Sequence, residues 1–328
     1  MKTWPGSEQE NSLMKLLVKC IKVLLIGIGL FVILTVLLFG YRDIPVEELK
    51  IKYAQGTSSF TEVDGMNVHF RDEGVGDSTP IVLIHGTGSS LHTFDGWSER
   101  LISDYRVVRM DLPGYGLTGP FPNRDYSIEN YVDFIQHFLS ARGIEKCILG
   151  GNSLGGHIAW RFAVKYPDNV DKLILIDASG YPTRANSVPV AFKIAQIPVI
   201  KNIFTYITPR FIARASVENV YADRNKVTEP LVDRYFELTL MEGNRQAFID
   251  RFDAKQDTSA YLKIKTIRQR SLVLWGAEDN LIPKEIAYEF HKDLPNDTLV
   301  IMEDVGHVPM EELPGPSLQA VLNFLDSD

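Results

Sequence analysis

The serine at position 153 lies at the centre of a short motif that could carry nucleophilic chemistry. Its sequence is Gly151-Asn152-Ser153-Leu154-Gly155-Gly156, preceded by the apolar run 146–150 and followed by a helix-like pattern from 157 to 166. A strand, a sharp turn and a helix form a nucleophile elbow, which exposes a serine hydroxyl above a sheet. We expect glycine at 151 and 155 because a Cβ there would collide with the neighbouring strand and helix. The motif indicates an enzyme only if a base and an acid accompany it.

A serine hydroxyl becomes an effective nucleophile when a histidine takes its proton and an acid orients that histidine. In enzymes that have a nucleophile elbow, the acid and the histidine each follow a strand late in the sequence. Asp279 and His307 both stand directly after such strand-like runs. Glu278 competes with Asp279 for the role of the acid, and we favour Asp279 because its shorter side chain suits a tight loop. Asp304, three residues from His307, is a weaker alternative.

Acyl transfer also needs two N–H donors for the oxyanion that develops during attack. An apolar run ends in the glycine-rich turn 86–90, which can present a backbone amide. Within it we expect the amide of Thr87 to be the first donor, with Gly88 as the second choice. The amide of Leu154, at the positive end of its helix, is the other expected donor.

Three further polar residues near these motifs have structural interpretations. We expect His85 to be bonded within loops and Asp111, in the sequence Asp-Leu-Pro-Gly-Tyr-Gly, to support a tight loop. His157, one helical turn after Ser153, is interpreted as a helix-packing or pocket-wall residue.

Short strand-like runs and helical patterns must position these residues. The expected strands are Phe60–Val63, Asn67–Arg71, Ile81–His85, Arg106–Met110, Cys147–Gly150, Leu173–Asp177, Leu272–Trp275 and Leu299–Met302. The expected helices include Ile128–Ala141, Ser153–Tyr166, Lys284–Lys292 and Ser317–Leu325. The first two strands flank Asp64-Gly65, a hairpin signal, and the later ones alternate with helices. This order predicts an α/β fold, with a mostly parallel eight-stranded sheet flanked by helices on both faces.

The alternation stops between residues 181 and 268, where the patterning is helical. We therefore predict a core at 59–180 and 269–328, with 181–268 as a helical cap inserted after the sixth strand. Such an insertion would cover the carboxyl ends of the strands, where open α/β sheets bind ligands. Its first half is unusually apolar: Val188, Val190, Phe192, Ile194, Ile197, Val199, Ile200, Ile203, Phe204, Ile207, Phe211 and Ile212. Most of these residues should pack the cap against the core, and a fraction should line a lipophilic pocket.

Residues 23–41 contain no charged side chain, and as a helix this run would be roughly 28 Å long, close to the hydrocarbon thickness of a bilayer. The run is too long for a typical signal-peptide core, and no small-residue cleavage site follows it. We predict a single-pass transmembrane anchor, with 1–22 as a cytoplasmic tail and 42–58 as a linker. Lysines concentrate before the span, so the positive-inside rule places the catalytic domain on the extracytoplasmic side.

From residue 43 onward, 29 Lys and Arg stand against 40 Asp and Glu, a net charge of −11. An acidic domain is not drawn to nucleic acid or anionic lipid by its charge. The two cysteines, Cys20 and Cys147, lie in different predicted environments and imply no disulfide. We expect neither a metal nor an organic cofactor.

With these residues assembled, the chain resembles the α/β-hydrolase superfamily across roughly residues 60 to 325. The motifs that carry the resemblance are His85-Gly86, the loop 111–116, the elbow 151–156, Trp275-Gly276-Ala277-Glu278-Asp279 and Gly306-His307. The apolar N-terminal run and the sequence 304–311 resemble bacterial lipases and esterases and membrane-anchored monoacylglycerol-lipase-like members. The resemblance implies hydrolysis of carboxylic esters that carry a lipophilic acyl chain.

Sister families differ at identifiable positions. Haloalkane dehalogenases and epoxide hydrolases have an aspartate at the elbow, where this chain has Ser153. The C–C hydrolases of meta-cleavage products share a Gly-Asn-Ser-x-Gly-Gly elbow. They usually have a Gly-x-Gly-Pro-Gly oxyanion loop and a tryptophan after the histidine, whereas here the turn 86–90 lacks proline and Val308 follows His307.

These observations predict a membrane-tethered serine hydrolase whose partner is a small lipophilic ester. A C–C hydrolase of the meta-cleavage type is the second hypothesis, and a non-catalytic binding protein of the same fold is the third. The oligomeric state, the acyl length and the head group stay open at this stage.

Overall fold

Eight strands form one sheet in the computed structural model, which describes residues 6–75, 79–198, 200–255 and 257–327. The strands are β1 Ser58–Val63, β2 Met66–Glu73, β3 Ile81–Ile84, β4 Val107–Met110, β5 Cys147–Asn152, β6 Val170–Ile176, β7 Arg270–Gly276 and β8 Asp297–Met302. Their spatial order is β1-β2-β4-β3-β5-β6-β7-β8. Strands β1, β2 and β4 pair antiparallel, and all the other neighbours pair parallel. The mostly parallel eight-stranded sheet predicted from the sequence is confirmed.

The central strands read as continuous apolar runs because both of their faces are covered. All residues of β3, β4 and β5 are buried. At the edge, the β1–β2 turn uses Asp64 and Gly65 with φ angles of 52° and 77°. Positive φ at both central residues is what a tight type I′ hairpin requires, so this turn signal was interpreted correctly.

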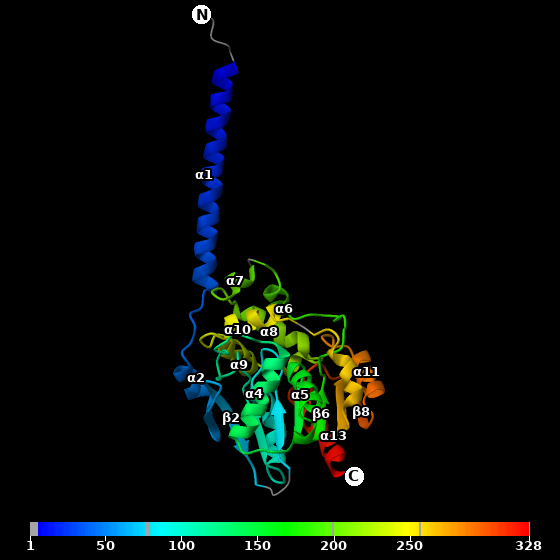
Figure 1. Cartoon of the computed structure of the whole chain (residues 1–328). Coiled ribbons are helices and arrows are strands. Elements are labelled where there is room, and N and C mark those ends of the chain that lie inside the picture. Colours follow the sequence, from blue (N-terminus) through cyan, green and yellow to red (C-terminus); the bar gives the residue numbers. More distant parts are fainter. Residues whose placement is uncertain (1–5, 76–78, 199, 256, 328) are drawn as a thin grey trace, which may run out of the picture.

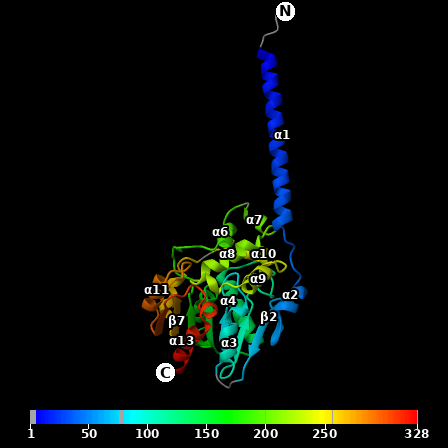
Figure 2. The same cartoon turned by 180° about the vertical axis from the view of Figure 1, so that it is seen from behind.

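Helices cover both faces of the sheet (Figure 1, Figure 2). The core helices are α3 Asp95–Leu101, α4 Ile128–Ala141, α5 Leu154–Lys165, α11 Glu285–Asp293, α12 Pro309–Glu312 and α13 Pro314–Asp326, with 3-10 turns η1 Leu91–Phe94 and η2 Pro167–Asn169. Two further 3-10 turns, η3 Arg224–Lys226 and η4 Ala260–Thr266, lie between β6 and β7. The apolar faces of α4, α5 and α11 contribute to one buried cluster, and those of α3 and α13 contribute to a second. The four helices predicted from the sequence form within a few residues of the predicted ends, whereas α3 was not predicted.

The segment predicted as a cap is helical. Between β6 and β7 the chain forms α6 Val190–Ala195, α7 Ile200–Phe204, α8 Arg210–Val220, α9 Glu229–Thr239 and α10 Asn244–Asp253. These helices lie at the end of the globular part that is nearest the N-terminal helix (Figure 1). They cover the carboxyl ends of the parallel strands, so the strand-end loops lie beneath them.

A long helix, α1 Gly6–Phe39, extends from the globular part (Figure 1). Within the described residues it contains the single candidate membrane span, Glu10–Phe39. The apolar part of this span has a mean hydropathy of 2.8 and is not buried against the rest of the protein. The helix is longer than the predicted span 23–41 and takes in much of the predicted tail 1–22, of which residues 1–5 lie outside the described part. The predicted linker 42–58 contains a further helix, α2 Val46–Tyr53, whose Leu49 and Tyr53 are buried.

The end of α1 is attached to the cap rather than to the sheet. Two backbone hydrogen bonds, of 3.1 and 3.2 Å, join segment 39–41 to segment 206–208 as a short antiparallel bridge. Arg245 of α10 is buried and donates to the carbonyl of Tyr41 at 2.9 Å and to the carboxylate of Asp43 at 2.6 Å. Backbone pairing and a charge-assisted bond together fix where α1 leaves the domain.

Candidate active site

Ser153 occupies the sharp turn between β5 and α5. Its φ and ψ angles are 56° and −113°, a combination that L-residues rarely adopt. The turn is held from both sides: the Ser153 amide donates to the carbonyl of Ile176 at 3.0 Å, and the Ser153 carbonyl accepts from the amides of His157 and Ser179. Strained residues of this kind persist where the surroundings fix them, commonly at functional sites. The strain points the Ser153 side chain away from the sheet.

The two glycines of the motif make room for this turn. A Cβ built on Gly151 would lie 2.3 Å from backbone atoms of Gly155 at the start of α5. A Cβ on Gly155 would lie 2.1 Å from the carbonyl oxygen of Ile84 in β3. Both contacts are with backbone atoms, which cannot move aside as a flexible side chain can. The collisions expected from the sequence are therefore present.

His307 is bonded to Asp279. The histidine Nδ1 lies 2.6 Å from Asp279 Oδ2, and both side chains are buried. The other carboxylate oxygen of Asp279 accepts the amides of Leu281 and Ile282 at 2.8 and 2.9 Å. Because the carboxylate is fixed by these amides, it holds the imidazole with its Nδ1 proton towards Asp279 and its Nε2 free to accept a proton.

The Nε2 atom of His307 is buried and has no hydrogen-bond partner. It therefore does not bond to the Ser153 hydroxyl in this structure. Such contacts are often long before substrate binds and shorten in the complex. A buried acceptor with no partner is costly, and it is suited to receive a proton from a group that enters or rotates into the site.

The structure distinguishes the three carboxylates considered for the acid. Asp279 is buried against His307, whereas Glu278 and Asp304 are exposed at the surface. The reason is local: the turn after β7 directs alternate side chains inward and outward, and only position 279 points towards the histidine loop.

The turn after β3 lies directly beside Ser153. A Cβ built on Gly86 would be 3.1 Å from the Cβ of Ser153, so the backbone of this turn approaches the nucleophile closely. Thr87 and Gly88 follow on the same turn. Leu154 is the first residue of α5, and the amides of a first helical turn have no partner within the helix. Both sets of predicted donors are thus on backbone next to Ser153.

The polar residues interpreted as structural have structural contacts. His85 lies 2.8 Å from the carbonyl of Gly86 through Nδ1 and accepts the amide of Leu112 at 2.9 Å through Nε2. The carboxylate of Asp111 accepts the amides of Leu91 and Leu117 at 2.7 and 2.8 Å. These bonds hold the loops on either side of the turn 86–90, where the first oxyanion donor is predicted.

His157 stacks on Trp160 with a centroid separation of 5.0 Å. Burial, assisted by nearby arginines, lowers the pKa of His157 to about 3, so its ring is neutral. A neutral ring stacked along the helix is consistent with the expected packing role.

Two residues that the sequence reasoning did not identify complete the site. Asn152, one residue before the nucleophile, donates to the carbonyl of His307 at 2.9 Å and ties the histidine loop to the elbow. Glu312 accepts the amide of Gly306 at 2.8 Å and that of Asp223 at 2.8 Å, which joins the histidine loop to the cap. The bonds from Asn152 to His307 and from Asp223 to Glu312 link positions far apart in the sequence, so they have no local signal.

Asp177, directly after β6, is the third unexpected residue. One carboxyl oxygen accepts the amide of Gly276 at 2.9 Å, and the other is buried without a partner. Burial, together with the neighbouring negative charge of Asp279, raises the pKa of Asp177 well above its ordinary value. A carboxyl group that keeps its proton here can donate it towards Asp279. The available signal was an acid that ends an apolar strand, as Asp279 does after β7.

The side chains of Asp177, Asp279 and His307 offer ligand atoms within 4.8 Å of one another, the arrangement that a metal ion would need. Most of these atoms are already occupied by hydrogen bonds to amides or to each other. The cluster fits a proton held between two carboxyl groups better than a cation, which would have to displace these bonds.

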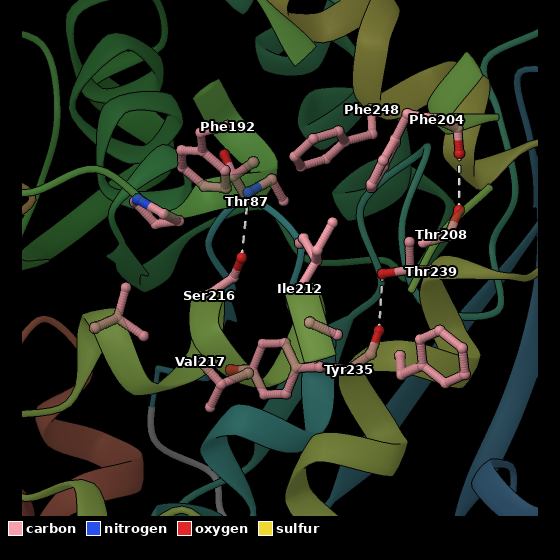
Figure 3. A pocket seen from close by; sticks show the side chains of 16 residues that line it. Thr87, Phe192, Phe204, Thr208, Ile212, Ser216, Val217, Tyr235, Thr239 and Phe248 are labelled. Carbon is pink, nitrogen blue, oxygen red and sulfur yellow. Dashed lines mark hydrogen bonds between the residues drawn. The ribbon is translucent and has the colours of Figure 1, made fainter. Parts of the chain in front are cut away.

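A cavity extends from the turn after β3 into the cap (Figure 3). Its wall is formed by Thr87, Gly88, Pro189, Ala191, Phe192, Phe204, Thr208, Ile212, Ala213, Ser216, Val217, Val220, Tyr235, Phe236, Thr239 and Phe248. None of these sixteen residues is charged. Three of the predicted apolar cap residues, Phe192, Phe204 and Ile212, are among them, so the expectation of a lipophilic pocket is met in part.

The other predicted cap residues are divided between the interior and the surface. Val190, Ile197, Ile200, Ile203 and Phe211 are exposed. Val199 lies outside the described residues.

Comparisons with known proteins agree with this geometry. A family model described as the alpha/beta hydrolase fold matches residues 79–314. Lipase 1 of Psychrobacter immobilis is 29% identical over 267 residues, which cover 77% of this chain and 79% of the lipase. The 2-hydroxy-6-oxo-2,4-heptadienoate hydrolase of Pseudomonas putida is 26% identical over 274 residues, 80% of this chain and 94% of that enzyme.

Among solved structures, a membrane phospholipase A described as a bacterial virulence factor superposes with a TM-score of 0.70. The match has 23% identity and covers 95% of this chain and 98% of the phospholipase. At this identity, the likeness establishes a shared fold.

Proposed function

Because this chain is a hydrolase that belongs to the alpha/beta-hydrolase fold family, we propose that it cleaves carboxylic esters of lipophilic substrates through a serine nucleophile. The observation that carries the proposal is the buried pair His307–Asp279 with a free Nε2, beside the strained turn of Ser153. An orienting acid, a base with one free nitrogen and a projected hydroxyl are what acyl transfer to serine requires.

In the proposed reaction the Ser153 hydroxyl attacks the ester carbonyl while Nε2 of His307 takes its proton. Asp279 stabilises the imidazolium that forms, and the amides of Thr87 and Leu154 donate to the oxyanion. His307 then gives the proton to the alcohol that leaves. Water, activated by the same histidine, attacks the acyl-enzyme carbonyl, and Ser153 regains its proton as the acid product departs.

The cavity supports a lipophilic acyl chain as the substrate group. Its wall is apolar apart from a few hydroxyl groups. Two of these, on Thr208 and Thr239, donate to the backbone carbonyls four residues earlier (Figure 3). A hydrocarbon chain would gain burial there without leaving a polar group unsatisfied. Lipase 1, a relative at 29% identity, is consistent with this class of substrate.

We further propose that α1 anchors the enzyme in a membrane, with the hydrolase domain on the extracytoplasmic side. The length and hydropathy of Glu10–Phe39 support an anchor. The match to the membrane phospholipase A also supports it. The match covers 95% of this chain and so leaves about 16 residues unmatched. Because α1 has 34 residues, at least part of α1 lies within the matched region. The concentration of lysines before the span supports the orientation.

The relative from Pseudomonas putida favours a second candidate, hydrolysis of a C–C bond. The substrate named for that enzyme is an enoate, which carries a carboxylate. The cavity described above has no cationic side chain in its wall to pair with one. Burying a carboxylate without a partner costs free energy. Ester hydrolysis is therefore better supported than hydrolysis of a C–C bond.

The proposal is tested with the full-length chain in detergent, using a fluorophosphonate probe and a panel of p-nitrophenyl esters of increasing acyl length. The Ser153→Ala variant should no longer be labelled by the probe, and its ester turnover should fall by a factor of roughly 10⁴–10⁶. A matched control is Ser140→Ala, which removes an exposed hydroxyl on α4 that bonds only to the carbonyl of Gln136.

Normal labelling and ester turnover by Ser153→Ala would show that the nucleophile lies elsewhere. Faster turnover of a vinylogous diketone than of every ester would instead favour the C–C hydrolase. All variants are purified in the same detergent, and the circular dichroism spectrum of Ser153→Ala should match that of the wild type, which identifies a misfolded variant.

A further inference from the structure

An exposed apolar surface covers the side of the cap nearest α1. It consists of Ile197, Ile200, Ile203, Tyr206 and Phe211, and we refer to these five residues as the apolar cap face. Tyr206 is 74% exposed and Phe211 is 60% exposed. Large apolar side chains gathered in one place on a surface mark an interaction site, whereas isolated ones are ordinary.

The apolar cap face lies within a stretch that has no acidic residue. From position 178 to position 217 the chain contains no Asp or Glu and five Lys or Arg, although the domain as a whole is acidic. A surface that enters lipid must not carry carboxylates, because each would have to lose its water. The negative net charge of the domain therefore conceals a local segment of the opposite character.

The position of this surface is fixed by its connection to α1. Segment 206–208, which includes Tyr206, pairs with segment 39–41 at the end of the apolar helix. The rings of Phe39 and Phe211 meet edge to face, with centroids 5.8 Å apart. In both views α7 lies at the end of the globular part from which α1 departs (Figure 1, Figure 2). A bilayer that holds α1 would reach the apolar cap face at the same depth as Tyr41.

The cavity lies immediately behind this surface. Two pairs of consecutive residues show the arrangement: Ile203 and Phe211 are exposed, while Phe204 and Ile212 line the cavity. Each of the two helices α7 and α8 therefore has one side chain at the surface and the next one in the wall of the cavity. The same two helices lie between the apolar cap face and the cavity.

We propose that the apolar cap face inserts into the bilayer that holds α1, and that ester substrates enter the cavity from the lipid through α7 and α8. The inference rests on the proposed function, in particular on α1 being a membrane anchor. Aromatic and aliphatic side chains at the depth of the headgroups are the ordinary means by which a protein surface lies in a membrane interface.

Insertion is tested without relying on any activity. The full-length chain carries Cys20→Ala and Ile203→Cys, and the new thiol is labelled with an environment-sensitive fluorophore; the remaining Cys147 is buried. The labelled protein is reconstituted in phosphatidylcholine vesicles that contain spin-labelled lipid. The matched control is Val75→Cys. Val75 is 81% exposed and lies two residues after Glu73, the last residue of β2. Glu73 pairs with Val107, the first residue of the parallel strand β4, so position 75 is at the end of the sheet opposite the cap.

We expect the label at position 203 to be quenched by the spin-labelled lipid and the label at position 75 not to be. Equal quenching at the two positions, or none at either, would overturn the proposal. Because no substrate is present, this result does not depend on which bond the enzyme cleaves.

Entry from the lipid is tested with the double variant Ile200→Asp and Ile203→Asp, with Val75→Asp as the control. Neither altered isoleucine lines the cavity. Hydrolysis of p-nitrophenyl palmitate embedded in vesicles should fall roughly tenfold or more, because the carboxylates oppose insertion, while hydrolysis of dissolved p-nitrophenyl butyrate should be retained.

An equal loss on both esters, or no loss on either, would contradict the proposed entry route. If the wild-type chain hydrolyses neither ester, the proposed function fails, and the quenching at position 203 still decides whether the apolar cap face lies in lipid.

Discussion

The substitution Asp177→Asn provides a direct test of the electrostatics around the histidine–carboxylate pair. Asp177 is fully buried beside Asp279, and its pKa is raised well above the ordinary value of 3.8 by burial and by the neighbouring charge. An asparagine has the same shape, can accept the Gly276 amide through its oxygen and can donate to Asp279 through its nitrogen. The substitution therefore removes the titration at position 177 while it keeps the hydrogen bond from the Gly276 amide.

The sign of the effect follows from proton binding. Above the pKa of the unfolded chain, the folded protein holds a proton on Asp177 that the unfolded chain has lost. The wild-type free energy of unfolding should then fall by about 1.4 kcal/mol for each pH unit, until the folded carboxyl group also ionises. The Asn variant lacks this titration. Its free energy of unfolding should therefore rise relative to that of the wild type as the pH increases above the ordinary carboxyl pKa.

The measurement is denaturant unfolding of the full-length chain in detergent across this pH range, followed through the fluorescence of the buried Trp97, Trp160 and Trp275. Other titrating groups are common to both proteins and largely cancel in the difference. Unfolding free energies that remain parallel with pH would refute the claim that Asp177 keeps a proton. Ester turnover of the Asn variant should change little, since Asp279 keeps its bonds to His307 and to the amides of Leu281 and Ile282.

Two further predictions concern packing and the cavity. Gly155→Ala places a methyl group against the carbonyl of Ile84 and should destabilise the fold by about 3 kcal/mol in thermal unfolding, whereas Gly29→Ala, with open space around it, should not. Ile212→Trp should fill the acyl cavity and lower turnover of long-chain relative to short-chain esters by roughly tenfold, while the exposed neighbour substitution Phe211→Trp should leave the chain-length profile of dissolved esters unchanged.

The parts of the site that the sequence predicts are those whose signal is local. The elbow around Ser153 requires glycines at fixed positions. Asp279 and His307 follow apolar runs that form strands, of which β7 is almost entirely buried and β8 is partly buried. The choice of Asp279 over Glu278 also rests on local geometry, and the 2.6 Å contact to His307 agrees with it.

The remaining features depend on side chains that meet only after the sheet has formed. Asp177 and Asp279 end neighbouring strands, β6 and β7, and their proximity depends on the strand order. Asn152 and His307 are joined across 155 positions. The exposed residues of the cap could not be separated from those lining the pocket, since a five-residue helix such as α7 is too short for periodicity to define its faces.

The attachment of α1 to the cap has a mechanical consequence. The backbone bridge between 39–41 and 206–208 and the bonds of Arg245 make the end of the anchor part of the cap. Apart from its contacts with the cap, the core is connected to the same helix, among the described residues, through segment 42–57, which includes α2. If the anchor is fixed in a bilayer, the cap is the stationary element and the sheet, with Ser153, is the part that swings. Any separation of the cap from the core would therefore be a rotation of the core beneath the membrane rather than a movement of the cap away from a fixed core.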